Sequence, residues 1–208
     1  FVPTMGALHN GHTSLIKKSV LENDYSVISI FINPTQFNNI NDYESYPIDI
    51  SKDIELLDSI SENIILFTPD TDEIYSGKVV SDSYDFGDLD KYMEGEYRKG
   101  HFQGVATVVH KLFEIVTPDN VYFGEKDFQQ LRIIEDLVQK NGYKLNVIRC
   151  KTVRQNDGLA LSSRNKKLDI YSQNIATNLF KALSFAKKNF DTLDLEIIYA
   201  KVEDLLQN

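Results

Sequence analysis

The sequence is poor in cysteine and in positive charge, and it lacks a long run of hydrophobic residues. Its single cysteine, Cys150, excludes a disulfide bond within the chain, which is typical of a reducing cytosol. A net charge of −9 argues against general nucleic-acid binding, because the phosphate backbone would be repelled. No apolar run approaches the roughly 20 residues of a membrane-spanning helix. These absences predict a cytoplasmic protein without nucleic-acid or membrane partners.

A secretory signal pattern is also missing, and the chain begins with Phe1 rather than Met, so we expect the natural N-terminus to lie upstream. The 208 residues, 42% of them hydrophobic and 25% charged, suffice for one large or two modest globular domains. The basic side chains gather locally, beside glycine, serine or histidine, so small anions remain possible ligands. These basic residues are Arg98, Lys99, Lys126, Arg154, Arg164, Lys166 and Lys167.

Predicted strands and helices alternate over residues 1–151. The run YSVISIFI (residues 25–32) is typical of a strand buried on both faces, and NIILF (residues 63–67) is predicted to be another. The other predicted strands are residues 1–3, 120–124 and 143–150, and the predicted helices are residues 13–21, 49–59, 103–116 and 127–140. The alternation predicts an α/β fold with a doubly wound, parallel, Rossmann-like sheet.

The pattern changes near Thr152, where we expect a domain boundary. Residues 152–168 carry turn-forming residues in their middle, and two helices are predicted at residues 172–188 and 195–207. We therefore predict a first domain over residues 1–151, which binds nucleotide and substrate, and a smaller lid domain over residues 152–208. Little sequence follows the last helix, so we expect this lid domain to be partial.

The segment PTMGALHNGHTSLI (residues 3–16) joins a predicted strand to a predicted helix and carries two histidines, His9 and His12. The first turn of a helix presents unpaired N–H groups and a partial positive charge, which favour an anion. Gly11 lets a ligand approach the backbone, and the imidazoles add donors beside it. An ordinary turn with surface histidines is the alternative, but the strand-to-helix context favours a phosphate site.

Two segments offer groups suited to a small organic acid. FINPTQF (residues 31–37) follows a buried strand, where ligands bind in open parallel sheets, although alone it reads as an Asn-Pro turn. Its amides are Asn33 and Gln36. RKGHFQGVATVVHKLF (residues 98–113) opens a helix whose valine stripe is typical of a core-facing surface, although its first turn can also present valines to an apolar ligand.

Two further segments suit phosphate. FGEKDFQQL (residues 123–131) places a lysine beside Asp127, a pair that suits phosphate and Mg²⁺ together, unless Asp127 only caps the following helix. DGLALSSRN (residues 157–165) combines serine hydroxyls with a guanidinium that can bind phosphates in a bidentate manner. Serine-rich loops often have no such role, so this segment alone is a weak indication.

Taken together and in this order, these segments resemble the pantoate–β-alanine ligases (pantothenate synthetases) of the H-x-G-H nucleotidyltransferase superfamily. The resemblance runs through nearly the whole chain and includes PTMGALHNGH, FINPTQF, SYP, GHFQGVATVVHKLF, FGEKDFQQL and DGLALSSRN. The H-x-G-H motif alone is shared by many adenylyl- and cytidylyltransferases, whereas the combination is specific to this family.

The resemblance implies an AMP-forming ligase of pantothenate (coenzyme A precursor) biosynthesis. Such an enzyme uses ATP and Mg²⁺ to convert (R)-pantoate to pantoyl adenylate with release of pyrophosphate, and β-alanine then displaces AMP. The nucleophile is a carboxylate that is already ionised at neutral pH, so the protein mainly has to position two anions and neutralise charge. A cytoplasmic homodimer is a further expectation from the family.

The resemblance also implies residue roles. The catalytic, phosphate-gripping residues would be His9, His12, Lys126, Ser162, Ser163 and Arg164. Further contacts to ATP would come from Pro3, Thr4, Met5, Gly6, Gly124, Asp127 and Val153, with Asp127 near Mg²⁺. Pantoate would contact Met5, Asn33, Gln36, Val105, Val109 and Gln130. Arg98 and His101 would lie where β-alanine enters.

Two departures from the family pattern stand out. Ile48 follows Tyr46-Pro47 where family members commonly have Arg, which removes a cation. Lys99 stands where they commonly have Pro, which frees the backbone and adds charge.

Two alternatives stay open. Another transferase of the superfamily, such as a phosphopantetheine adenylyltransferase, would lack the FGEKDFQQL glutamines and the valine stripe. A non-catalytic nucleotide-binding module would tolerate the loss of Lys126, His12 or the Ser-Ser-Arg run, and all of these are present.

Overall fold

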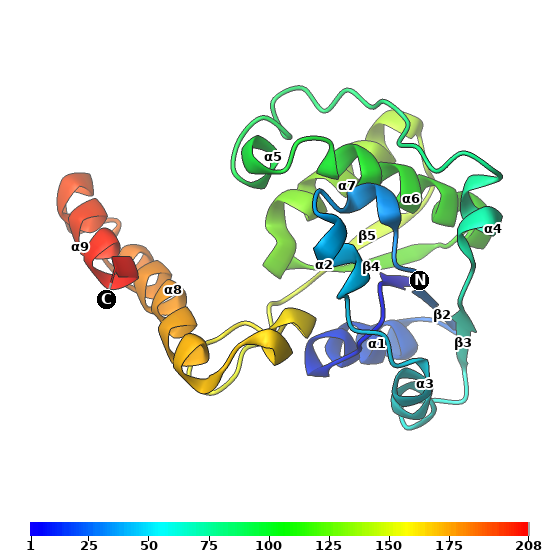
Figure 1. The fold of residues 1–208 in the computed structure, drawn as a ribbon, viewed down its shortest axis with the longest axis horizontal. Helices are drawn as coiled ribbons and strands as arrows, with labels where there is room; N and C mark the ends of the chain where they lie inside the picture. Colours follow the sequence, from blue (N-terminus) through cyan, green and yellow to red (C-terminus); the bar gives the residue numbers. More distant parts are fainter. Residues whose placement is uncertain (208) are drawn as a thin grey trace. The chain divides into compact units, whose positions relative to one another are not determined.

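The computed structural model describes residues 1–207 and divides the chain into two compact units, Phe1–Lys151 and Thr152–Asn208. The first unit is an α/β domain built on parallel strands (Figure 1). Its strands are β1 (Val2–Thr4), β2 (Ser26–Ile30), β3 (Ile64–Phe67), β4 (Asn120–Gly124) and β5 (Asn146–Cys150). The predicted α/β class with a parallel, Rossmann-like sheet is confirmed.

The strand order places a switch point between β1 and β4. β1 pairs with β2, β2 with β3, and β4 with β5, all in parallel. Phe1 joins the two ladders: its carbonyl accepts the Tyr122 N–H at 2.9 Å, and its nitrogen donates to the Asn120 carbonyl at 2.7 Å. The resulting order is β3-β2-β1-β4-β5. In open parallel sheets, ligands bind at the carboxyl ends of the strands that flank such a switch point.

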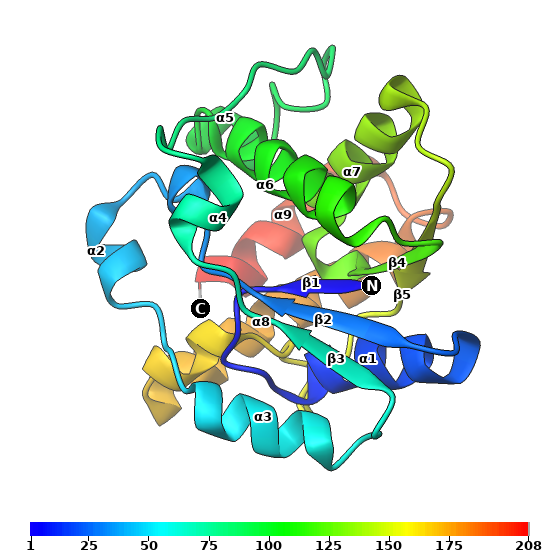
Figure 2. The ribbon, with the colours of Figure 1, turned by 90° about the vertical axis from the view of Figure 1, so that its right-hand side faces the viewer.

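Helices cover both faces of this sheet. Figure 2 shows α1 and α3 on one face and α6 and α7 on the other. The helices of the unit are α1 (Asn10–Glu22), α2 (Ile40–Glu44), α3 (Ile50–Asp58), α4 (Thr71–Tyr75), α5 (Glu94–Tyr97), α6 (His101–Val116) and α7 (Phe128–Asn141), with short 3-10 turns η1 (Pro34–Gln36) and η2 (Glu125–Asp127). Each face has its own apolar core, one with the valines of α6 and one around Ile16, Ile28 and Leu57.

Several local predictions were wrong. β3 is an edge strand rather than a buried one, since Ile65 is 51% exposed. α1 begins three residues before the predicted start, because His9 caps it, and α6 begins at His101 rather than at residue 103. β5 begins at Asn146 rather than at residue 143. Apolar periodicity marks the buried middle of an element better than its ends.

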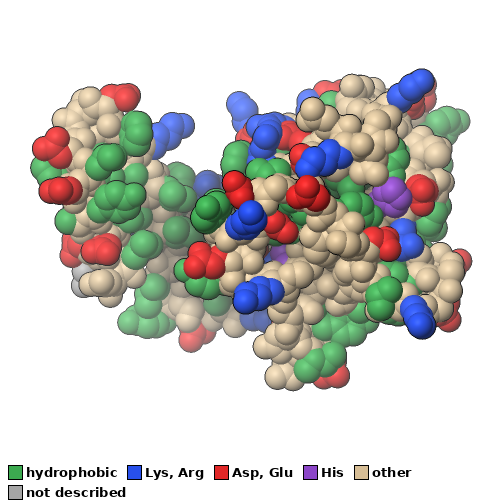
Figure 3. All heavy atoms as spheres, turned by 90° about the horizontal axis from the view of Figure 1, so that it is seen from above, with side chains coloured by type: hydrophobic (Ala, Val, Ile, Leu, Met, Phe, Trp, Pro, Cys, Tyr) green, Lys and Arg blue, Asp and Glu red, His purple; other side chains and the backbone are tan. Residues whose placement is uncertain are grey.

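The second unit begins with a hairpin and ends in two helices. The hairpin turns at Gly158, whose φ is +94°, and is held by the Leu161 N–H donating to the Val153 carbonyl at 3.0 Å. Its later elements are η3 (Ser163–Lys167), α8 (Ile170–Asn189) and α9 (Leu195–Gln207). Figure 3 shows hydrophobic side chains on the surface of this helix pair. The exposed apolar residues include Ile170, Tyr171, Ile175, Leu179, Leu183, Ile197 and Tyr199.

Within residues 1–207 no helix has the length and apolarity needed to cross a membrane.

Candidate active site

The two histidines after β1 form a mutual cap at the start of α1. His9 is the N-cap residue, and its Nδ1 accepts the Gly11 N–H at 3.0 Å. In return, Nδ1 of His12 accepts the His9 N–H at 3.3 Å. The ring centroids lie 4.0 Å apart. A capping box normally uses Ser or Thr with Glu or Gln, so histidines in both positions suggest a role beyond capping.

These hydrogen bonds fix the tautomer of each ring. A neutral imidazole that accepts at Nδ1 carries its proton on Nε2, so the donor of each ring is its Nε2–H group. Burial, the neighbouring His9 and the charge of Lys126 together lower the pKa of His12 to about 3. His12 is therefore neutral at physiological pH and is suited to donate a hydrogen bond, not to act as a cation.

Lys126 supplies the positive charge on the other side of the switch point. It lies in η2, directly after β4, and its Nζ is 2.8 Å from Oδ1 of the exposed Asp127. Asp127 occupies the N-cap position of α7 but makes no capping hydrogen bond with its side chain. Asp127 therefore has the exposed N-cap position that the alternative gave it, but its carboxylate pairs with Lys126 instead of capping the helix.

The turn after β2 is held by Asn33, which is only 1% exposed. Its Nδ2 donates to the Gly104 carbonyl at 3.0 Å and to Oε1 of Gln36 at 3.2 Å. Its Oδ1 accepts from the hydroxyls of Thr35 and Tyr75. The protein itself satisfies this amide, and one of these bonds holds the side chain of Gln36. Contact of Asn33 with pantoate remains a prediction.

Gln36 brings together four of the residues predicted to bind the organic substrates. Its half-buried amide donates to Sδ of Met5 at 2.8 Å. Its backbone carbonyl accepts from Nδ1 of His101 at 2.8 Å and from Arg98 at 3.4 Å. His101 must therefore carry its proton on Nδ1. Burial, and next Arg98, lower the pKa of His101, so this ring is also neutral at pH 7.

α6 and α7 carry the remaining predicted pantoate contacts. Val105 and Val109 are 3% and 4% exposed and belong to the main apolar core, as expected for a core-facing stripe. Gln130 is half-buried in the first turn of α7, and among residues 1–207 its amide makes no hydrogen bond. Contacts of these three side chains with pantoate remain predictions.

The other predicted ATP contacts of the first unit lie along β1 and β4. Pro3 and Thr4 lie in β1, and Thr4 Oγ1 donates to the Ser29 carbonyl at 2.7 Å and accepts the Gly6 N–H at 3.2 Å. Gly6 has a φ of +80°. Gly124 is the last residue of β4.

In the second unit, the Ser-Ser-Arg run follows the hairpin that contains Val153. Ser162 is the N-cap of η3 and accepts the Arg164 N–H at 3.2 Å. Ser163 is buried, whereas Arg164 is exposed. These residues lie together within their own unit.

Two buried polar side chains for which no role was predicted are Asp53 and Gln129. Asp53, in α3, accepts backbone N–H groups of the segment before His9. Gln129 donates to the carbonyls of Leu89 and Tyr92, both at 2.7 Å, and so fixes the loop before α5. The burial of Asp53 could have been predicted from the sequence, because Asp53 lies on the apolar face of its helix together with Leu57, four residues later.

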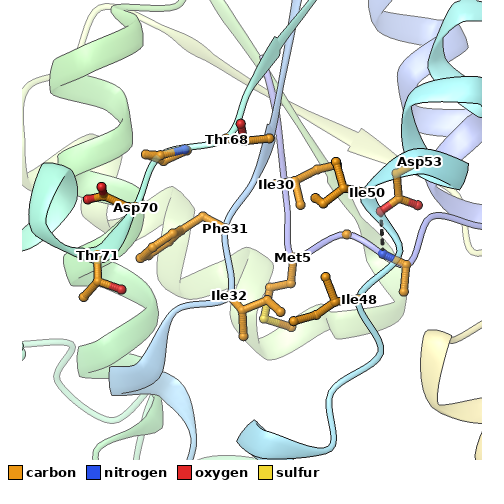
Figure 4. Close-up of a pocket in the computed structure, with 13 residues that line it drawn as sticks. Met5, Ile30, Phe31, Ile32, Ile48, Ile50, Asp53, Thr68, Asp70 and Thr71 are labelled. Carbon is orange, nitrogen blue, oxygen red and sulfur yellow. Dashed lines mark hydrogen bonds between the residues drawn. The ribbon is translucent and has the colours of Figure 1, made fainter.

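A pocket of about 310 Å³ opens at the carboxyl ends of β1, β2 and β3 (Figure 4). Its walls are mostly apolar, and Met5, Ile30 and Ile50 are among them. Ile48, the residue that replaces the family's usual arginine, also lines it, so this departure adds an apolar group to the pocket. Lys99, the other departure, is exposed.

A parallel sheet with a switch point, flanked by imidazole donors and a lysine, defines the class of Rossmann-like nucleotide-binding α/β proteins. A family model described as "Pantoate-beta-alanine ligase" matches residues 1–208. The pantothenate synthetase of Flavobacterium psychrophilum is 50% identical over 192 residues, which cover 92% of this chain and 68% of that protein. That of Bacteroides thetaiotaomicron is 45% identical over 207 residues, covering 98% and 73%. The chain belongs to the pantoate-beta-alanine ligase family.

Solved structures agree with this assignment. The pantothenate synthetase of Thermus thermophilus matches with a TM-score of 0.93 at 40% identity, covering 99% of this chain and 75% of that one. The pantoate-beta-alanine ligase of Francisella tularensis, described as complexed with beta-gamma ATP and beta-alanine, matches with a TM-score of 0.86 at 44% identity, covering 98% and 76%.

Proposed function

We propose that this protein condenses (R)-pantoate with β-alanine through a pantoyl-adenylate intermediate, releasing pyrophosphate and AMP. Family membership gives the overall reaction, an ATP-dependent pantoate–β-alanine ligation. The proposed step is attack of the pantoate carboxylate on the α-phosphorus of ATP, followed by attack of the β-alanine amine on the adenylate carbonyl. We also expect the active protein to be a cytoplasmic homodimer.

The main support for the proposal is the pair of Nε2–H donors of His9 and His12 at the switch point, near the charge of Lys126. Two neutral donors and one cation suit a phosphate chain whose charge shifts toward the leaving pyrophosphate in the transition state. In the second unit, Ser162, Ser163 and Arg164 are further phosphate-binding candidates. Burial raises the pKa of the Cys150 thiol to about 11, which makes an acyl-thioester route through it unfavourable.

Mg²⁺ fits this site as an ion carried by ATP. Among residues 1–207 no group of three or more His, Cys, Asp or Glu side chains could hold a metal alone. Mg²⁺ often binds through one carboxylate and the substrate phosphates, and Asp127 is the carboxylate that would hold it here. When bound, the ion would neutralise phosphate charge.

Two experiments, transfer of an oxygen isotope and exchange between ATP and pyrophosphate, test whether pantoyl adenylate is the intermediate. Pantoate labelled with ¹⁸O in its carboxylate should deliver one labelled oxygen to AMP when β-alanine completes the turnover. Pantoate-dependent exchange between ATP and pyrophosphate should proceed without β-alanine. Formation of ADP and labelled orthophosphate would overturn the adenylate route. Exchange that requires phosphopantetheine instead of pantoate would favour the alternative transferase.

Pantoate that lacks one methyl of its gem-dimethyl group should be adenylated with an efficiency lower by about 10–200-fold, since one methyl in an apolar pocket is worth roughly 1–3 kcal/mol. The proposed reason is contact with Val105 and Val109. The measurement is kcat/KM in the exchange assay for both acids. In a Val109→Ala variant, the kcat/KM values for the two acids should differ less than in the unmodified protein. Equal use of both acids by the unmodified protein would show that the valines serve only the core.

A further inference from the structure

A buried carboxylate holds the turn that leads from β1 to the histidines. Asp53 is only 3% exposed and lies in the first turn of α3. Its Oδ2 accepts the Ala7 N–H at 2.9 Å, and its Oδ1 accepts the Leu8 N–H at 2.7 Å. Figure 4 shows the Asp53 carboxylate beside the chain that continues from Met5, with the bond to Ala7 dashed.

The turn held in this way has a costly backbone conformation. Gly6 and Ala7 are successive left-handed residues, with φ values of +80° and +49°. Left-handed geometry is unfavourable for alanine, so it persists only where the surroundings impose it. Two charge-assisted hydrogen bonds to one carboxylate can do so, because such bonds are about twice as strong as neutral ones.

The space around the turn allows little displacement. A Cβ atom added at Gly6 would lie 2.9 Å from Cγ2 of Ile30 and 3.0 Å from Oδ2 of Asp53. The turn therefore has β2 on one side and the Asp53 carboxylate on the other. His9 follows Leu8 directly, and its backbone N–H in turn binds the ring of His12.

We infer that Asp53 is a positioning residue for adenylate formation: it fixes the turn at Gly6 and Ala7 and thereby aims the Nε2–H donors of His9 and His12. The inference rests on the proposed function, because it assigns these two donors to the phosphate chain. Asp53 acts on the two donors through the backbone of residues 7–9, since its carboxylate binds the Ala7 and Leu8 N–H groups. Loss of this carboxylate should therefore act mainly on the rate of the adenylation step, because the two donors act on the charge that develops along the phosphate chain.

Asp53→Asn tests the inference. An amide has nearly the shape of the carboxylate, but its NH₂ group faces a backbone N–H and cannot accept from it. We expect single-turnover adenylate formation to slow by about 10–100-fold per mole of folded protein, because small misplacements of catalytic groups have effects of this size. KM values for ATP and pantoate should change by less than about threefold, since the variant displaces groups that act on the transition state. Asp53→Glu, which keeps the charge, should recover part of the rate.

Asp49→Asn is the matched control, since it makes the same exchange at the exposed N-cap of the same helix, and it should leave the rate unchanged. Histidine ¹⁵N spectra give a readout without substrate: the signals of His9 and His12 should move in Asp53→Asn, and those of His110 should not. If Asp53→Asn does not fold, Gly6→Ala displaces the same turn with the carboxylate intact, and it should slow the step as well.

A wild-type rate and unmoved His9 and His12 signals in folded Asp53→Asn, or a wild-type rate in Gly6→Ala, would overturn the inference. Failure of the proposed function has a different signature, because the wild-type protein would then show no pantoate-dependent exchange.

Discussion

Replacing His12 with asparagine should slow adenylate formation by about 10²–10³-fold without unfolding the protein, the loss expected for one donor that stabilises transition-state charge. Asn places its Oδ1 close to where the imidazole has Nδ1. The variant can therefore still accept the His9 N–H, which Nδ1 of His12 accepts at 3.3 Å. What it loses is the Nε2–H donor. Rapid-quench measurement of adenylate formation with saturating ATP and pantoate gives the rate.

His12→Gln is the informative counterpart, because its terminal NH₂ lies near the place of Nε2–H while the acceptor for His9 is lost. It should retain more of the rate than His12→Asn, although the cap of α1 is weakened. With a pKa lowered to about 3 by burial, His9 and Lys126, the His12 ring stays neutral. The wild-type rate should therefore not fall on account of His12 as the pH drops through 6.5. If His12→Asn matched the wild-type rate, this donor would have no role in the chemistry.

The sequence predicted the fold class because its buried segments are strongly patterned. The valine stripe of α6 has the hydrophobic period of a helix, whereas residues 25–32 form a short β-branched and aromatic run that is typical of a buried strand. The edge position of β3 could not be predicted in this way, since an apolar run does not reveal whether a neighbouring strand covers it. Exposure of Ile65 depends on sheet order, which is a property of the whole chain.

The candidate site was predictable where a motif places donors next to each other in sequence, as in His9 and His12. The proposed roles of Asn33 and Asp53 depend on hydrogen bonds that span large distances along the chain. Asn33 binds the carbonyl of Gly104, and Asp53 binds the N–H groups of Ala7 and Leu8. Such partners become visible only when the fold brings them together, and local periodicity carries little information about them.

Gly104→Ala should lower kcat/KM for pantoate by about 10²-fold, the scale for a displaced substrate-positioning group, and it should leave the KM for ATP nearly unchanged. A Cβ at this position would lie 2.4 Å from the Thr35 carbonyl oxygen and 2.9 Å from the Gln36 nitrogen. Both atoms belong to the backbone, so η1 itself must move away from α6. Gln36 moves with η1, and we propose that its amide binds pantoate. Steady-state kinetics with each substrate varied in turn give the measurement.

Overpacking of this kind also lowers the free energy of unfolding, typically by about 1–3 kcal/mol. A control substitution at another glycine is therefore needed to distinguish a loss of stability from a displacement of Gln36. Gly142→Ala serves that purpose. Its φ of +67° makes alanine unfavourable, by roughly 1 kcal/mol, yet a Cβ there would meet nothing within 4 Å. Both variants should unfold at lower temperature, but only Gly104→Ala should lose efficiency with pantoate. Equal kcat/KM values in the two variants would mean that close packing of η1 on α6 supports stability alone, and the placement of Gln36 would then need another explanation.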